Sequence, residues 1–292
     1  MAEQILSAIF YAVTSIIIGT GIILYLIANK IPPNPFLGFR IGYAYVSRSV
    51  WVKLNRIAGL IFTLVGLLTI VESFFINYEV VLLLLPIQLI VATILLVEYA
   101  ERIAERELIK IPEGKEEKLE PIKPFYPHIL HIIVPIAMLV AFVYFAITLY
   151  PQLPEKVAVH FNIHGIPNRY GSRTEVLATI IAAPAMVYTL LFFFIYLGVK
   201  KPVAFYKPWF KPQIVYRIVN ILYTLLAVVA VTITLALIDV LYYNVYGEHV
   251  LPVMIIGSFT TVVILGLTLY LVVIVVMSVR KRKIIVGKNI GV

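Results

Sequence analysis

The feature that most constrains the fold is a series of apolar stretches, each close to the roughly 20 residues that a helix needs to cross a membrane. Because the hydrocarbon core offers no water to satisfy backbone amides, each stretch must be helical. Hydrophobic residues make up 62% of the chain and charged residues 13%, whereas soluble domains contain about 45–50% apolar residues. We therefore predict an all-α polytopic membrane protein whose seven helices cover 5–28, 57–76, 80–96, 129–149, 176–197, 214–238 and 251–277.

The connections between these stretches differ in charge, and the difference predicts their orientation. All but three of the 24 lysines and arginines lie in the alternating segments 28–56, 98–128, 198–217 and 278–292. The other connections contain only Lys156, Arg169 and Arg173. Since basic residues near membrane helices are retained on the cytoplasmic side, we predict an external N-terminus and a cytoplasmic C-terminus. The first stretch is expected to be an anchor and not a cleaved signal peptide.

Several functional classes are excluded by composition and motifs. The net charge of +9 comes from the loops just described, so it sets topology and does not indicate nucleic-acid binding. The chain contains no cysteine, which excludes disulfides and thiolate chemistry. It also contains no nucleotide-binding loop, HExxH pair or nucleophile elbow. We expect a non-enzymatic protein without a cofactor, whose first partner is the lipid bilayer.

The longest run without the composition of a membrane span is 153–173, LPEKVAVHFNIHGIPNRYGSR. Val157, Val159 and Phe161 alternate with Ala158 and His160, which predicts a short strand. Turn-forming residues follow within seven positions, namely Gly165, Pro167, Asn168 and Gly171. These predict a bend with a positive φ angle, with Asn168 bonding its own backbone. The loop 150–175 is therefore expected to hold a small ordered hairpin, or a strand and loop, outside the membrane.

This run resembles the extracytoplasmic domain of unknown function 1648, which accompanies the SdpI family of membrane immunity proteins. The resemblance rests on Leu153, Pro154, His160, Phe161, Asn162, Gly165, Pro167, Tyr170, Gly171 and Ser172. Arg169 lies among them and is counted with the motif. Ala158, Asn168 and Arg173 stand where the family usually has proline, aspartate and lysine. The loss of that aspartate weakens any hypothesis in which this motif binds a metal.

The first basic loop, 28–56, carries a second signature. Its prolines forbid a helix at its start, and Gly38 permits a tight turn. The segment resembles the signature of the SdpI family itself, through Asn34, Pro35, Gly38, Arg40, Trp51, Asn55, Arg56 and Gly59. Gly42 and Ala44 replace the usual proline and threonine. The two signatures stand in the reverse of the family's usual order.

Arg40 lies in a turn bounded by prolines, and two interpretations of it stay open. In the first, the arginines of this loop anchor it to lipid phosphates at the membrane surface. In the second, the turn holds the Arg40 guanidinium rigidly for a bidentate contact with a carboxylate or a protein partner.

These features divide the chain into four parts. Residues 1–100 form an SdpI-like unit of three spans, and 101–128 form a charged, proline-rich cytoplasmic connector. Residues 129–198 comprise two spans that flank the extracytoplasmic motif, and 199–292 comprise two further spans and a basic tail.

His160 and His164 are the candidate metal ligands of the outer motif. A turn between them could bring both imidazoles to one ion, yet two ligands are too few for a zinc site. The alternative is that His160 packs beneath the loop and satisfies buried backbone groups, while His164 is exposed. We expect the structural role for His160, and no metal.

Two carboxylates, Glu72 and Asp239, lie near the outer ends of spans, where a charge must face other helices or water. The resemblance implies a protein that recognises an extracellular peptide or toxin, in immunity or signalling, with a cytoplasmic regulator as a second partner. One alternative is a small secondary transporter or flippase-like protein that uses these carboxylates for coupling. Another is a membrane metalloenzyme that uses the two histidines.

Overall fold

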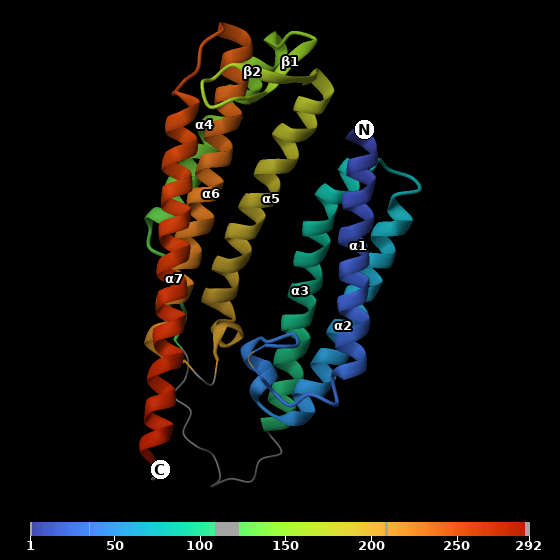
Figure 1. Cartoon of the computed structure of the whole chain (residues 1–292), viewed down its shortest axis with the longest axis vertical. Coiled ribbons are helices and arrows are strands. Elements are labelled where there is room, and N and C mark those ends of the chain that lie inside the picture. Colours follow the sequence, from blue (N-terminus) through green and yellow to red (C-terminus); the bar gives the residue numbers. More distant parts are fainter. Residues whose placement is uncertain (1, 35, 109–122, 208–209, 290–292) are drawn as a thin grey trace. The chain divides into compact units, whose positions relative to one another are not determined.

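The computed structural model describes residues 2–34, 36–108, 123–207 and 210–289. The chain is mainly helical and forms two compact units, which are described separately. Unit 1 comprises 1–124 and 200–212, and unit 2 comprises 125–199 and 213–292. Figure 1 shows the elements of each unit in sequence colours.

Unit 1 contains three long helices, with α2 packed against both α1 and α3. Two short 3-10 helices, η1 and η3, contact each other although they lie far apart in the sequence. The bounds are α1 Ala2–Ile27, η1 Gly42–Tyr45, α2 Arg48–Glu72, α3 Tyr78–Leu108 and η3 Pro202–Phe205.

Helix α2 begins earlier than the sequence predicts. The basic loop was expected to reach residue 56, but α2 begins at Arg48, so Trp51, Asn55 and Arg56 are helical. Ser47 explains this start, because its hydroxyl accepts a hydrogen bond from the Val50 amide at 3.1 Å and caps the helix. Pro35 of the predicted motif and residues 109–122, half of the connector 101–128, lie outside the described residues.

Glycines allow α1 and α2 to approach closely. A Cβ atom at Gly59 would lie 2.6 Å from the carbonyl oxygen of Gly21, which is closer than real Cβ contacts allow. Such contacts between small residues are typical of helices packed in a membrane.

Unit 2 contains four long helices and one antiparallel hairpin at one end of them (Figure 1). Prolines lie inside α4 and α5, as neighbouring helices permit in membrane proteins. The bounds are α4 Leu130–Leu149, η2 Tyr150–Gln152, β1 Lys156–Phe161, β2 Pro167–Ser172, α5 Arg173–Lys200, α6 Pro212–Tyr246 and α7 Val253–Asn289.

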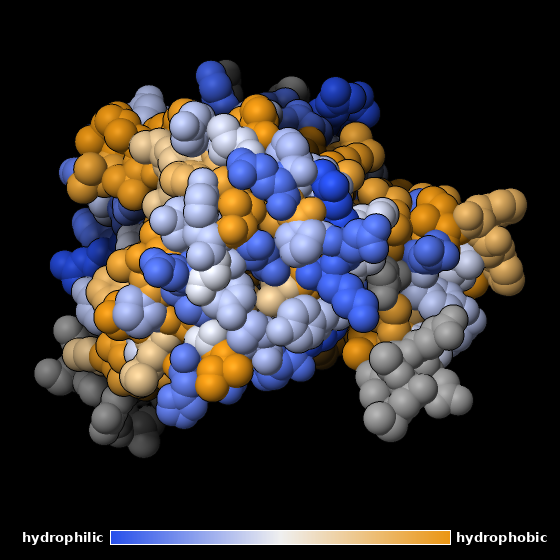
Figure 2. Space-filling model, turned by 90° about the horizontal axis from the view of Figure 1, so that it is seen from above, coloured by the Kyte–Doolittle hydropathy of each residue, from blue (hydrophilic) through white to orange (hydrophobic). Residues whose placement is uncertain are grey.

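The hairpin shares a core with the helix ends below it. Val157 of β1 is fully buried, in a cluster with Phe142, Leu149, Val176 and Leu241. Most residues of β2, in contrast, are exposed. Seen from this end, Figure 2 shows many hydrophilic residues on the outward surface, beside the apolar residues of the helix flanks.

Seven helices are long and apolar enough to cross a membrane. All seven predicted spans therefore correspond to helices, although every observed helix except α4 extends beyond its predicted bounds at one end or both. The apolar window of α7 is wholly unburied within the described structure, as suits a helix that faces lipid. The chain is a multi-pass membrane protein.

The close contact of α1 and α2 gives a matched prediction, because Gly59 and Gly19 are both helical glycines. We expect Gly59→Ala to destabilise unit 1 by about 1–3 kcal/mol through overpacking. Gly19 has no atom within 4 Å of an added Cβ, so Gly19→Ala should be neutral or stabilise by up to about 1 kcal/mol. Thermal unfolding in detergent measures both; equal midpoints would contradict the packing.

Candidate functional site

The turn of the hairpin is built around Asn162. Its side-chain oxygen accepts hydrogen bonds from the amides of His164 and Ile166, at 2.9 and 3.0 Å. The backbone N–H of Asn162 donates to the Ile166 carbonyl, also at 3.0 Å. Gly165 has a φ angle of +76°, as the turn requires. The predicted positive φ is thus confirmed, but the prediction that Asn168 bonds its own backbone is wrong, because Asn162 forms the turn.

One side of the hairpin is held by Asn244 of α6. The Asn244 side-chain oxygen accepts from the Ala158 amide at 2.7 Å, and its nitrogen donates to the Ala158 carbonyl at 2.9 Å. An amide side chain thereby replaces a neighbouring strand along β1. Without it, both polar groups of Ala158 would be buried without partners, because Ala158 is 1% exposed.

His249, in the connection between α6 and α7, joins the turn to Asp239. Its Nδ1 atom lies 2.7 Å from Asp239 Oδ2, and its Nε2 atom lies 2.9 Å from the Gly165 carbonyl oxygen. The second carboxylate oxygen of Asp239 accepts from the Val250 amide at 2.7 Å. A Cβ atom at Gly165 would lie 2.9 Å from His249 Nε2, so only glycine permits this approach.

Both ring nitrogens of His249 therefore face acceptors. A neutral imidazole carries one N–H and would leave a lone pair directed at an oxygen, whereas the imidazolium donates to both. Burial acts to lower the pKa of His249, but its hydrogen bonds to Gly165 and Asp239, with the charge of Asp239, outweigh this, and the pKa is raised above the ordinary 6.5. The structure thus favours a charged His249 hydrogen-bonded to the Asp239 side chain.

Aromatic rings complete the clamp around this imidazole. Tyr243 of α6 stacks on His249 with ring centres 4.6 Å apart, and Phe161 of β1 meets it edge-on at 4.9 Å. Phe161 and Tyr243 also contact each other at 4.8 Å. A cation is favourable over an aromatic face, so the Tyr243 ring further stabilises the imidazolium.

The structural role predicted for His160 belongs to His249. His160 is exposed, and its Nδ1 atom lies 2.6 Å from the side-chain oxygen of Asn168. It therefore does not pack beneath the loop. His164 is exposed, as predicted. Among the described residues, no group of three or more histidine, aspartate or glutamate side chains is arranged to hold a metal ion.

Of the remaining motif residues, those from Arg169 to Ser172 lie on β2, and Pro154 precedes β1. Arg169 forms an ion pair with Glu175 of α5, whose carboxylate fills the space where a Cβ at Gly171 would lie. Pro154 and Tyr170 are exposed. Ser172 accepts a hydrogen bond from the Glu175 amide at 3.1 Å and so caps α5.

The second motif forms a comparable turn in unit 1. Asn34 accepts hydrogen bonds from the amides of Phe36 and Leu37 at 2.9 and 2.8 Å. Gly38 has a φ angle of +108°. Asn55 of α2 accepts from the Phe39 amide at 2.6 Å and fixes the end of the turn.

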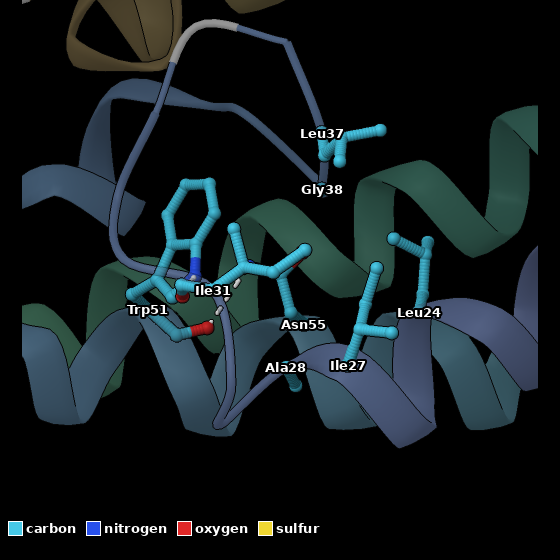
Figure 3. Close-up of a pocket in the computed structure, with 8 residues that line it drawn as sticks. All are labelled: Leu24, Ile27, Ala28, Ile31, Leu37, Gly38, Trp51 and Asn55. Atoms are coloured by element: carbon cyan, nitrogen blue, oxygen red, sulfur yellow. Dashed lines mark hydrogen bonds between the residues drawn. The ribbon is translucent and has the colours of Figure 1, made fainter.

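Trp51 and Asn55 line a small cavity below this turn, with Leu24, Ile27, Ala28, Ile31, Leu37 and Gly38 (Figure 3). The indole nitrogen of Trp51 donates to the Ile31 carbonyl at 3.0 Å. The cavity encloses about 10 Å³, the lower limit for one water molecule. This cavity is too small for a ligand, so the buried motif residues here serve the turn. Arg40 and Arg56 are exposed.

Each of the two turns lies in a region of the chain that matches the model of a protein family. Residues 30–99 match the model of the SdpI/YfhL protein family, and residues 136–186 match DUF1648, a domain of unknown function. The chain thus contains one region similar to the SdpI/YfhL family and one similar to DUF1648. No curated protein and no solved structure matches it. Asp239, Asn244 and His249 lie outside both matched regions, so the hairpin in the DUF1648 region is held by residues beyond that region.

The two predicted carboxylates have different surroundings, one in each unit. Asp239 is 4% exposed and bound by His249 and Val250. The two carboxylate oxygens of Glu72 accept hydrogen bonds from the Gln88 side-chain nitrogen at 2.7 and 2.8 Å. Thr69 donates to Gln88 at 3.3 Å. Gln88 was not predicted; a single amide in an apolar span is the signal that indicates it.

The raised pKa of His249 predicts that docking of the hairpin depends on pH. The stabilisation of the docked hairpin by charged His249 is complete below the ordinary pKa of 6.5. It is lost as pH rises through the higher pKa that His249 has in the folded protein. A charged hydrogen-bonded pair of this kind contributes about 1.5–3 kcal/mol, or at least about tenfold in protection. Hydrogen exchange of residues 157–171 in detergent, corrected for intrinsic rates, should show protection falling from pH 6 to pH 9.

Two variants provide controls. His249→Gln should remove this pH dependence and expose the hairpin at every pH, whereas His160→Gln should leave the dependence unchanged. Protection that is constant with pH in the unmodified protein would contradict the charged bridge.

Proposed function

We propose that this SdpI-like membrane protein binds an extended peptide along the outer edge of β2, on the external side of the membrane, and acts by recognition without catalysing a reaction. The observation that carries this proposal is that one edge of the hairpin is covered and the other is open. Asn244 occupies the edge of β1.

The direction of the backbone groups on β2 follows from the pairing. Ala158 is opposite Tyr170 in the antiparallel register. Residues opposite each other either bond each other or both point away, and both polar groups of Ala158 point to Asn244. The amide and carbonyl of Tyr170 therefore point to the far edge of β2. Among the described residues, no hydrogen bond from outside the hairpin reaches them.

The side chains beside this edge suit an apolar peptide. Ile163, Ile166 and Tyr170 are 68%, 59% and 61% exposed. They lie on a hairpin whose turn is fixed by the contacts of His249 with Gly165 and Asp239. Peptide binding therefore need not order the hairpin first. Strand addition of this kind takes affinity from backbone hydrogen bonds and specificity from the side chains beside the edge.

The small number of basic residues in the hairpin segment supports an external position for the hairpin. Its only basic residues are Lys156, Arg169 and Arg173, and Arg169 forms an ion pair with Glu175. The other basic residues lie in the segments expected at the cytoplasmic surface.

A selection from a phage-displayed library of linear peptides on intact cells tests the proposal, since phage reach only the external face. We expect an enriched apolar consensus. Tyr170→Pro removes the outward N–H while an edge position tolerates proline, and should weaken binding at least about tenfold. Tyr170→Thr keeps the N–H and should weaken binding less.

A cysteine at Ser172 provides the matched control for orientation in this cysteine-free chain. It should react with an impermeant maleimide in intact cells, whereas a cysteine at Ser47 should not. No enrichment despite labelling at residue 172, or equal binding by Tyr170→Pro and the unmodified protein, would refute the peptide edge.

A further inference from the structure

In unit 1, a carboxylate, an amide and a hydroxyl meet between two membrane helices. Glu72 is the last residue of α2, and Gln88 lies about 15 Å along α3 from Tyr78, by the rise per residue of an α-helix. The Gln88 side-chain nitrogen lies 2.7 and 2.8 Å from the two Glu72 carboxylate oxygens. Both helices are apolar enough to span a membrane, so the carboxylate is held against an apolar stretch of α3, where a charge is costly.

The charge of Glu72 is not balanced within the described part of the chain. No described lysine, arginine or histidine forms an ion pair with it, and the amide that binds it is neutral. Other carboxylates near span ends do have cations, since Asp239 is bound by His249 and Glu101 by Lys201. An ionisable side chain inside a membrane span is typical of a site for an ion or a substrate.

The hydrogen bonds around Glu72 contain fewer donors than acceptors. The fully buried Thr69 hydroxyl lies 2.8 Å from the Val65 carbonyl oxygen and 3.3 Å from the Gln88 side-chain oxygen. A hydroxyl carries one proton, so it cannot serve both acceptors, and the shorter contact is to Val65. The three side-chain oxygens of Glu72 and Gln88 are thus served by one NH₂ group and a shared hydroxyl proton.

We propose that Glu72 and Gln88 bind a monovalent metal cation, Na⁺, with Thr69 positioning the amide. Oxygen atoms are the ligands that hard cations take. Rotation of the Gln88 amide by half a turn directs its oxygen to the side of the carboxylate. Its nitrogen then donates to the Thr69 hydroxyl oxygen, which has a lone pair to accept it. The ion is thereby held by side chains from both α2 and α3.

The charge and the number of oxygens at this site select the ion. One carboxylate neutralises one positive charge, whereas a divalent ion would leave a net charge between apolar helices. A proton would occupy a single oxygen, whereas a metal ion takes several and so uses the surplus of acceptors. The site shares no residue with the peptide edge of β2, so either proposal can fail without the other.

The test is thermal unfolding of the full chain in detergent, in NaCl or in choline chloride at equal ionic strength. Na⁺ should raise the midpoint and reach saturation, whereas choline is too large for the site and should not. Glu72→Gln should abolish the rise. Gln88→Met keeps the length of the side chain but removes its oxygen, and should weaken the apparent Na⁺ affinity at least about tenfold.

Thr93→Val is the matched control. The Thr93 hydroxyl, on the same helix as Gln88, donates to the Leu89 carbonyl of that helix, so this variant should bind Na⁺ as the unmodified protein does. Thr69→Val, in contrast, should weaken Na⁺ binding because it releases the amide. No rise in the midpoint with Na⁺, or a rise that Glu72→Gln and Gln88→Met both retain, would overturn the proposal.

A carbodiimide that modifies carboxyl groups in apolar surroundings distinguishes a metal ion from a proton. In the unmodified protein, Na⁺ at constant pH should protect Glu72 from modification, as measured by mass spectrometry. Modification of Glu72 that increases as pH falls but is not reduced by Na⁺ would overturn the metal ion in favour of a proton. This arm needs no variant, so it decides even if Glu72→Gln fails to fold.

Discussion

A two-stranded hairpin does not hold a fixed shape in water by itself, so the outer motif depends on what the helices of unit 2 contribute to it. Asn244 contributes the hydrogen bonds of a missing strand. His249 connects the turn at Gly165 to Asp239, a carboxylate near the end of a membrane helix. A buried carboxylate and a buried carbonyl are each unfavourable without a partner. His249 supplies both partners, because it binds Asp239 and the Gly165 carbonyl at once.

The two family regions use the same construction in separate units. In each, an asparagine accepts two backbone amides and is followed by a glycine with positive φ: Asn34 with Gly38, and Asn162 with Gly165. In each unit, a helical asparagine also binds a backbone amide of the motif, Asn55 in the first and Asn244 in the second. Helix ends thereby impose one backbone shape on short loops whose large apolar side chains, such as Phe36 and Ile163, are exposed and do not pack in a core.

The elements of the fold could be predicted because their signals are local. Apolar runs gave the seven helices, and the alternation from Val157 to Phe161 gave β1. The start of α2 was missed, since 48–56 is too polar for a span and its cap, Ser47, is a weak signal.

The partners of the hairpin could not be predicted for a physical reason. His249 acts on Gly165, 84 positions away, and Asn244 acts on Ala158 across 86. No period or spacing in the sequence relates such pairs, and only packing brings them together. The same limit explains why His160, which lies in the recognised motif, was chosen for the structural role that His249 has.

The charge on His249 is the central claim, and nitrogen NMR tests it most directly. The protein would be labelled with ¹⁵N-histidine and compared with His249→Gln to assign the ring signals. The account predicts that, near pH 7, both Nδ1 and Nε2 of His249 carry a proton and that both protons are hydrogen-bonded. A single neutral tautomer at that pH, with one nitrogen unprotonated, would contradict it.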